Sequence, residues 1–243
     1  MNSEASSSNS PPTISVTAAR VAIVATSASF VCLVALHLLS PEFSPSWRMV
    51  SEYAFGKHGS VLSLMFLLWG LGTWALAAAL WSQARTTAGR AGLWLLIVAG
   101  LGEAMASVFD VSHAVGHGIA GALGVLGFPI AAMLVSASLD RAPAWSPTSR
   151  SLRRWCAHLT WVSVVLLVAT LTLMTMQVAR AYGGKLPQHA PKALPAGVIG
   201  VDGWADRLVI LSSFLWVVVV ASQGIRAQDS RPESTGPSSR AGR

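Results

Sequence analysis

Six long apolar runs most constrain what this chain can fold into. Each is about 18 residues or longer, the length that an α-helix needs to cross the hydrocarbon core of a bilayer. The runs cover residues 17–39, 60–81, 91–109, 118–139, 155–177 and 204–226. In lipid the backbone N–H and C=O groups have to pair within the segment, so the runs predict helices and not strands. The expected fold class is all-α, a polytopic membrane protein with a bundle of six transmembrane helices.

Composition and charge agree with a membrane domain. Of the 243 residues 53% are hydrophobic and 11% are charged, whereas soluble domains carry about 25% charged residues. The net charge of +7 is spread between the apolar runs and over the tail, which indicates membrane topology and not a nucleic-acid partner. The expected partner is the lipid bilayer, and the sequence specifies no oligomeric state. Residues 1–16 and 227–243 are polar tails predicted to be disordered, on either side of a membrane domain at 17–226.

The basic residues predict an orientation. If the N-terminus is cytoplasmic, eleven of the 17 Lys and Arg lie in inner segments. The group formed by Arg150, Arg153 and Arg154 is the strongest single signal. With six spans both termini lie on one side, so we expect an N-in/C-in protein of the cell membrane.

One stretch, residues 100–118, holds an unusual set of polar residues within apolar sequence. It contains Glu103, Asp110, His113 and His117. A charge at the middle of a membrane helix costs about 2.5–3.5 kcal/mol on insertion scales, so an intramembrane Glu usually has a partner. On a helix Glu103 and Asp110 share one face, and the two histidines share another. A short hairpin between the third and fourth spans then directs these groups toward one cavity.

The first outer loop is expected to complete this site. Ser51 and Glu52 lie in it, and His37 precedes it. Polar groups at the rim of an apolar bundle are better satisfied by each other than by lipid. We therefore expect Ser51 or Glu52 within reach of the turn at 110–117, with Trp47 and Tyr53 closing the pocket from above.

Three functional interpretations follow. The pocket would bind a lipid head group or a cation without catalysis. Alternatively, His113, His117, Asp110 and His37 would hold a metal such as zinc and activate water for hydrolysis of a lipid ester or amide. The candidate catalytic residues are then Ser51, Glu52 and Asp110. In the third interpretation Glu103 and Asp110 relay protons or cations through a carrier.

Purely structural roles account for the same residues. Asp110 is placed to cap the fourth helix, and the two histidines would sit at the level of the lipid head groups. Glu103 would bond a neighbouring helix in its neutral form. The residues alone favour these roles over a metal site, and a metal site over a relay. Gly116, Ala120 and Gly124 form a ridge of small residues that favours close helix packing, which predicts a central position for the fourth span.

A family resemblance covers residues 35–139. The loop SPEFSPSWRMVSEYAFGKHG, the Asp110 that ends the third span and the His117-Gly118 pair that opens the fourth resemble the membrane proteins called domain of unknown function 998 (DUF998). The DVSHAVGH turn has no Pro, whereas the corresponding turn of the family is usually richer in Pro. The resemblance implies the architecture and the position of a site, and no activity. A more distant likeness to the alkaline ceramidase group, which joins Ser, Asp and His at a buried zinc, is the analogy behind the hydrolase interpretation.

The arginine distribution generates a topology prediction. A reporter that is active only in the cytoplasm should be active when fused after Arg226 and silent when inserted near Pro187. Reporter activity measured in whole cells checks this. The reverse pattern would place the polar stretch on the cytoplasmic side.

Overall fold

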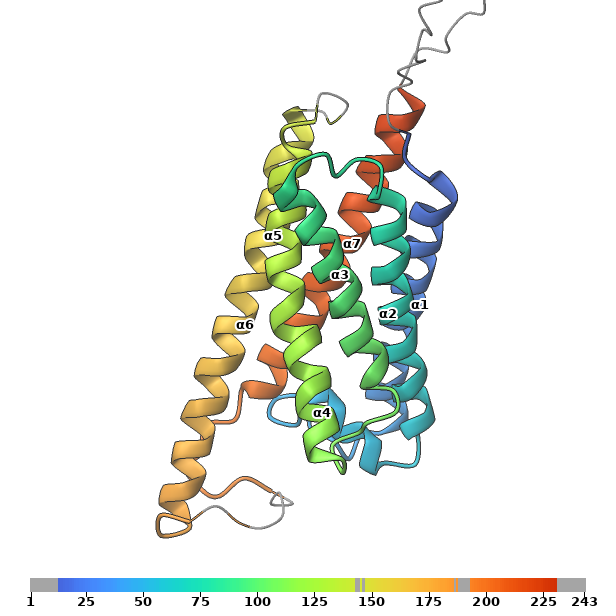
Figure 1. Cartoon of the computed structure of the whole chain (residues 1–243). Coiled ribbons are helices and arrows are strands. Elements are labelled where there is room, and N and C mark those ends of the chain that lie inside the picture. Colours follow the sequence, from blue (N-terminus) through green and yellow to red (C-terminus); the bar gives the residue numbers. More distant parts are fainter. Residues whose placement is uncertain (1–12, 143–144, 146, 186, 188–192, 231–243) are drawn as a thin grey trace, which may run out of the picture.

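Seven α-helices and two shorter helical segments make up the described part of this computed structural model (Figure 1), namely residues 13–142, 145, 147–185, 187 and 193–230. The α-helices are α1 (Val16–Leu39), α2 (Gly59–Leu80), α3 (Thr87–Met105), α4 (Ala114–Gly121), α5 (Gly127–Leu139), α6 (Pro147–Ala181) and α7 (Asp202–Asp229). A 3-10 helix, η1 (Val50–Phe55), lies in the first loop, and a π-helical segment, η2 (Ala122–Leu126), joins α4 to α5. The described residues contain no strand, so the all-α fold class is confirmed.

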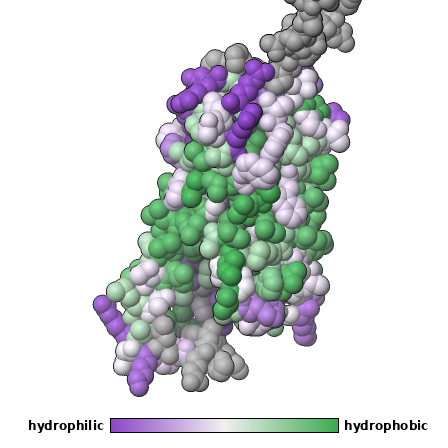
Figure 2. All heavy atoms as spheres, viewed as in Figure 1, coloured by the Kyte–Doolittle hydropathy of each residue, from purple (hydrophilic) through white to green (hydrophobic). Residues whose placement is uncertain are grey.

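The helices form six segments that are long and apolar enough to cross a membrane. Helices α4 and α5 with η2 between them make one segment, Ala114–Leu139. On the face shown in Figure 2, hydrophobic side chains form a band across the middle of the molecule, and hydrophilic ones gather at both ends. The six-helix multi-pass membrane architecture is therefore confirmed. The N-in/C-in orientation stays a prediction.

The spanning helices close into a ring in chain order. Each packs against the next one along the chain, and α7 completes the ring against α1 while also contacting α2 and α5. Helix α7 has the largest buried share of the six spans. The expectation of a central fourth span is therefore wrong, because the fully buried Trp216 and its neighbours on α7 fill the middle of the bundle.

The ridge of small residues instead brings α3 against α4 and η2. A Cβ added to Gly102 of α3 would lie 2.5 Å from the backbone nitrogen of Gly124 and 2.6 Å from the carbonyl oxygen of Ala120. Only glycine at position 102 permits this separation of the two helices. The wider turn of η2 lies at this same contact, because Gly124 belongs to it.

The ends of the bundle extend beyond the predicted membrane domain. Ile14 is buried, and its N–H donates to Oε1 of Gln228 over 3.2 Å. Residues 13–16, which composition assigned to the N-terminal tail, thus belong to the bundle. Helix α7 continues to Asp229, whereas residues 1–12 and 231–243 of the two predicted tails lie outside the described part. At the opposite end, α6 projects past the other helices (Figure 1).

The glycine contacts generate a paired prediction. Gly102→Ala should lower the free energy of unfolding by about 1–3 kcal/mol, because the new methyl group meets backbone atoms of a packed helix. Gly121→Ala should raise it by about 0.4–1 kcal/mol, because Gly121 has helical angles and open space beside it. Thermal unfolding in detergent measures both. Equal effects of the two substitutions would contradict the close contact at Gly102.

Candidate functional site

A cavity of about 350 Å³ lies in the half of the bundle opposite the two termini. Residues of η1, α2, α3, α4, η2, α6 and α7 line it, so nearly every element of the bundle contributes to it. Most of its lining is apolar or glycine. Its side chains with hydrogen-bond acceptors are Ser51, Glu103, His117 and Asp206, and the buried indole N–H of Trp69 is a donor without an acceptor among the described residues.

Glu103 is the polar group with the most demanding environment. It lies near the end of α3 and is only 3% exposed. Its Oε2 accepts a hydrogen bond of 2.6 Å from Oγ1 of Thr73 on α2. Its Oε1 is buried and has no partner among the described residues. A buried carboxyl oxygen without a partner costs about 1–3 kcal/mol, so this atom is the least satisfied polar group of the cavity lining that belongs to an acidic residue.

Asp206 holds the outer loop in position at the cavity. It lies in the first turns of α7, and its Oδ2 accepts a 2.7 Å hydrogen bond from the N–H of Val50, the first residue of η1. The next residue, Ser51, thereby joins the lining. One bond thus fixes two of the four polar groups relative to each other.

His117 enters the cavity from α4. Its Nδ1 lies 3.0 Å from the carbonyl oxygen of Phe109. Because a carbonyl only accepts, Nδ1 carries the proton, and Nε2 is left as an acceptor in the neutral ring. Together with the carboxyl groups of Glu103 and Asp206, this makes the cavity rich in acceptors and poor in donors.

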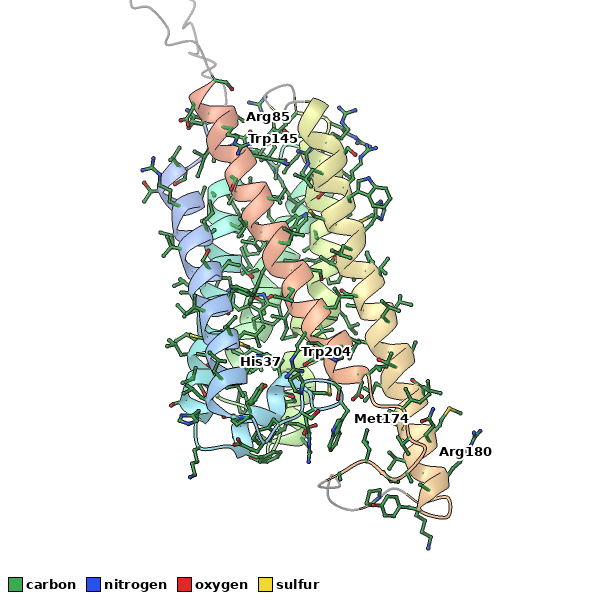
Figure 3. All side chains as sticks on the ribbon, turned by 180° about the vertical axis from the view of Figure 1, so that it is seen from behind. His37, Arg85, Trp145, Met174, Arg180 and Trp204 are labelled. Carbon is green, nitrogen blue, oxygen red and sulfur yellow. The ribbon has the colours of Figure 1, made fainter. Side chains whose placement is uncertain are left out.

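Beside the cavity lies Arg207, buried among neutral acceptors. It is 3% exposed. Its guanidinium donates to Nε2 of His37 at 2.7 Å, to the carbonyl oxygens of Arg48 and Gly203 at 2.8 Å each, and to the hydroxyl of Tyr53 at 3.2 Å. These bonds join α7 to the end of α1 and to the outer loop, and Figure 3 shows His37 near Trp204 at the start of α7.

His37 is therefore committed to the arginine. Its Nδ1 donates to the carbonyl oxygen of Leu33 at 2.6 Å, which leaves Nε2 as the acceptor for Arg207. Both ring nitrogens are used. The residue that we grouped with the possible metal ligands instead holds the outer ends of α1 and α7 together.

Asp110 and His113 lie in the exposed turn before α4 and do not line the cavity. Oδ1 of Asp110 accepts bonds from both the N–H and the hydroxyl of Ser112, and His113 Nδ1 lies 3.2 Å away. The bonds from Ser112 lower the pKa of the Asp110 carboxyl. The Asp110 side chain therefore bonds within the turn and does not cap α4. The residue at the N-cap position of α4 is His113.

The structure also shows where the remaining residues of the predicted site lie. Glu52 forms an ion pair of 2.6 Å with Arg48. Tyr53 is fully buried against Arg207. Neither Tyr53 nor Trp47 lines the cavity, and residues 49–51 of the same loop line it instead. Within the described ranges no three His, Cys, Asp or Glu residues are close enough to hold a metal ion. The set His113, His117, Asp110 and His37 is not brought together, because His37 bonds Arg207 and the first two face different surroundings.

Sequence reasoning missed Thr73, and it noted Asp206 at the start of the sixth span without assigning it to the site. Thr73 lies in an apolar run and carries no signal of its own. Asp206 does carry one, because it is an acidic residue directly before Arg207 in an apolar span. Two adjacent charges at that depth predict buried partners.

Comparison with known proteins agrees with this architecture. A family model described as "Protein of unknown function (DUF998)" matches residues 23–223. The match includes the last two spans, beyond the segment covered by the motifs. The chain therefore belongs to the DUF998 family. No curated protein and no solved structure matches it.

The Arg207 network generates a stability prediction. His37→Leu should lower the free energy of unfolding by about 1.5–3 kcal/mol, because it leaves a buried guanidinium N–H without an acceptor. The control is His58→Leu on the same side of the bundle, because no hydrogen bond of the His58 side chain occurs within the described residues. That change should stay within about 0.5 kcal/mol. Thermal unfolding in detergent measures both, and a His37 effect as small as the control would argue against the network.

Proposed function

We propose that this DUF998 protein binds an amphiphile with a cationic or hydrogen-bond-donating head group in the cavity at Glu103. The observation that carries the proposal is the buried Oε1 of Glu103, which has no partner among the described residues and belongs to a residue that lines the cavity. A donor from a ligand satisfies this atom. The orientation predicted from the arginines makes the cavity outward-facing, in the cell membrane.

The cavity lining supports the choice of ligand class. Its acceptors are Glu103, Asp206, Nε2 of His117 and the hydroxyl of Ser51, whereas Arg207 points to other partners. A head group that supplies donors or positive charge complements these atoms, and an anionic one meets two carboxyl groups. The rest of the lining is apolar, including Val125 and Leu167, and suits a hydrocarbon chain.

Two wall positions keep this space open. Gly118 and Gly121 line the cavity, and a Cβ at either would have no heavy atom within 4 Å. Helix packing therefore does not require glycine at these positions. Side chains there would occupy the cavity, so glycine preserves the volume that a ligand fills.

No observation favours the hydrolase or the carrier interpretation over binding. The candidate catalytic residue Ser51 lines the cavity, while Glu52 pairs with Arg48 and Asp110 with its own turn. For a carrier, Asp110 lies outside the cavity that holds Glu103. Binding is the function that the four cavity groups support together.

A ligand-dependent thermal shift tests the proposal. Dodecylamine should raise the unfolding midpoint of the purified protein, and dodecanoate of the same chain length should not. Glu103→Gln should fold, because the Gln side-chain oxygen still accepts from Thr73. It should lose at least about tenfold in dodecylamine affinity, because an NH2 donor then replaces the Oε1 acceptor.

The matched control is Glu52→Gln, which removes an equal charge from the neighbouring loop. It should leave the dodecylamine affinity unchanged, because Glu52 does not line the cavity. Equal stabilisation by dodecanoate, or an unaltered response of Glu103→Gln, would contradict the proposal.

A further inference from the structure

A second hollow, of about 500 Å³, lies at the other end of the bundle on the surface of α6. Arg150, Ser151, Arg154, Trp155 and His158 line it. Residues 150, 154 and 158 are spaced by four and so share one face of the helix. Figure 2 shows hydrophilic side chains over this end of the molecule. The hollow is far from the cavity at Glu103, and none of its residues enters the proposed function.

The charges beside the hollow do not balance. Ion pairs of Arg150, Arg153 and Arg154 all end on the carboxylate of Asp140, which is 5% exposed. Arg153 is fully buried, pairs with Asp140, and also donates to Oε1 of Gln223 at 2.8 Å. One carboxylate thus serves three guanidinium groups. The excess of two positive charges lies on the two arginines that line the hollow.

These two arginines retain capacity for an external acceptor. The side chain of Arg154 is 57% exposed and donates through Nε to Asp140 at 2.5 Å, which leaves its terminal nitrogens available. Arg150 is 43% exposed and donates through Nη2 to the backbone oxygen of Asp140 at 2.9 Å. Its other terminal nitrogen, Nη1, makes no hydrogen bond to a described residue. Two neighbouring guanidinium groups that still have N–H donors to offer suit the oxygens of a phosphate.

The surface of α6 that follows the arginines along the helix is exposed and apolar, which suits contact with lipid. Trp155 is 70% exposed directly beside Arg154, and an exposed Trp next to an apolar helix face is typical of the head-group level of a membrane. Further along α6 the exposed residues are apolar, among them Val162 and Val165. A phosphate at the arginines would therefore have its acyl chains along this face.

We propose that this face of α6 binds the phosphate of an anionic phospholipid, at the membrane surface where both termini lie. Because of the excess positive charge, we expect a head group that has no cationic group of its own, such as phosphatidylglycerol, to bind more tightly than phosphatidylcholine. The neighbouring apolar face distinguishes the lipid from free phosphate, because only the lipid has chains to place there.

Native mass spectrometry of the protein in mixed phosphatidylglycerol and phosphatidylcholine nanodiscs tests the site. The wild type should retain phosphatidylglycerol in preference. The double variant Arg150→Gln/Arg154→Gln should lose about thirty-fold in relative affinity for it, since each surface arginine contributes about a factor of five. Arg154→Lys, which keeps the charge, should lose only a few-fold.

The control is Arg85→Gln/Arg90→Gln, which removes the same charge at the same end, from the loop before α3 and from the first turn of α3. It should retain the preference. Trp155→Ala leaves every arginine bond in place and should weaken retention several-fold, so it tests the site even if the double variant does not fold. The unfolding midpoint in phosphatidylcholine alone reports folding of each variant.

Four outcomes would overturn the proposal. The first is a wild type without preference between the two lipids, and the second is a control variant that loses as much as the double variant. The third is full binding by Trp155→Ala. The fourth is displacement of phosphatidylglycerol by millimolar inorganic phosphate at constant ionic strength, which would assign the arginines to free phosphate instead of lipid.

Discussion

The half of this bundle opposite the two termini depends on the burial of one positive charge. Arg207 lies within an apolar span, where a cation without partners is strongly disfavoured. Its acceptors come from α1, the outer loop and α7 itself. Bonding one guanidinium therefore fixes three segments at once, and the adjacent Asp206 then positions η1 through Val50. The walls of the cavity follow from these bonds.

The two ends of the bundle stabilise buried arginine in different ways. At the end with both termini, Arg153 pairs with the carboxylate of Asp140. At the opposite end, Arg207 bonds a ring nitrogen, two carbonyl oxygens and a hydroxyl, all of them neutral. The nearby carboxyl groups of Glu103 and Asp206 thus keep their oxygens for the cavity and for the backbone of η1. This division makes an acceptor-rich cavity possible beside a buried cation.

The sequence was sufficient for the spans and only partly so for the site. Apolar length alone placed all six helices, because a bilayer leaves few alternatives. Glu103 and His117 stood out as rare polar residues, and both line the cavity. Asp110 and His113 stood out equally, yet they face outward. Periodicity cannot separate these pairs, because the rotation of α4 is set by bonds of the turn to Ser112 and by the contact at Gly102.

The π-helical segment η2 has a consequence for how the fourth span could change in evolution. A π turn holds one residue more than an α turn, so removing a single residue from Ala122–Leu126 would restore a continuous α-helix. The wide turn covers nearly the same angle with its extra residue as an α turn covers without it, so α4 and α5 would keep almost the same rotation relative to each other. His117 would still face the cavity, and the core on α5 would stay packed. The fourth span could therefore gain or lose one codon in this segment without turning its site away from the cavity.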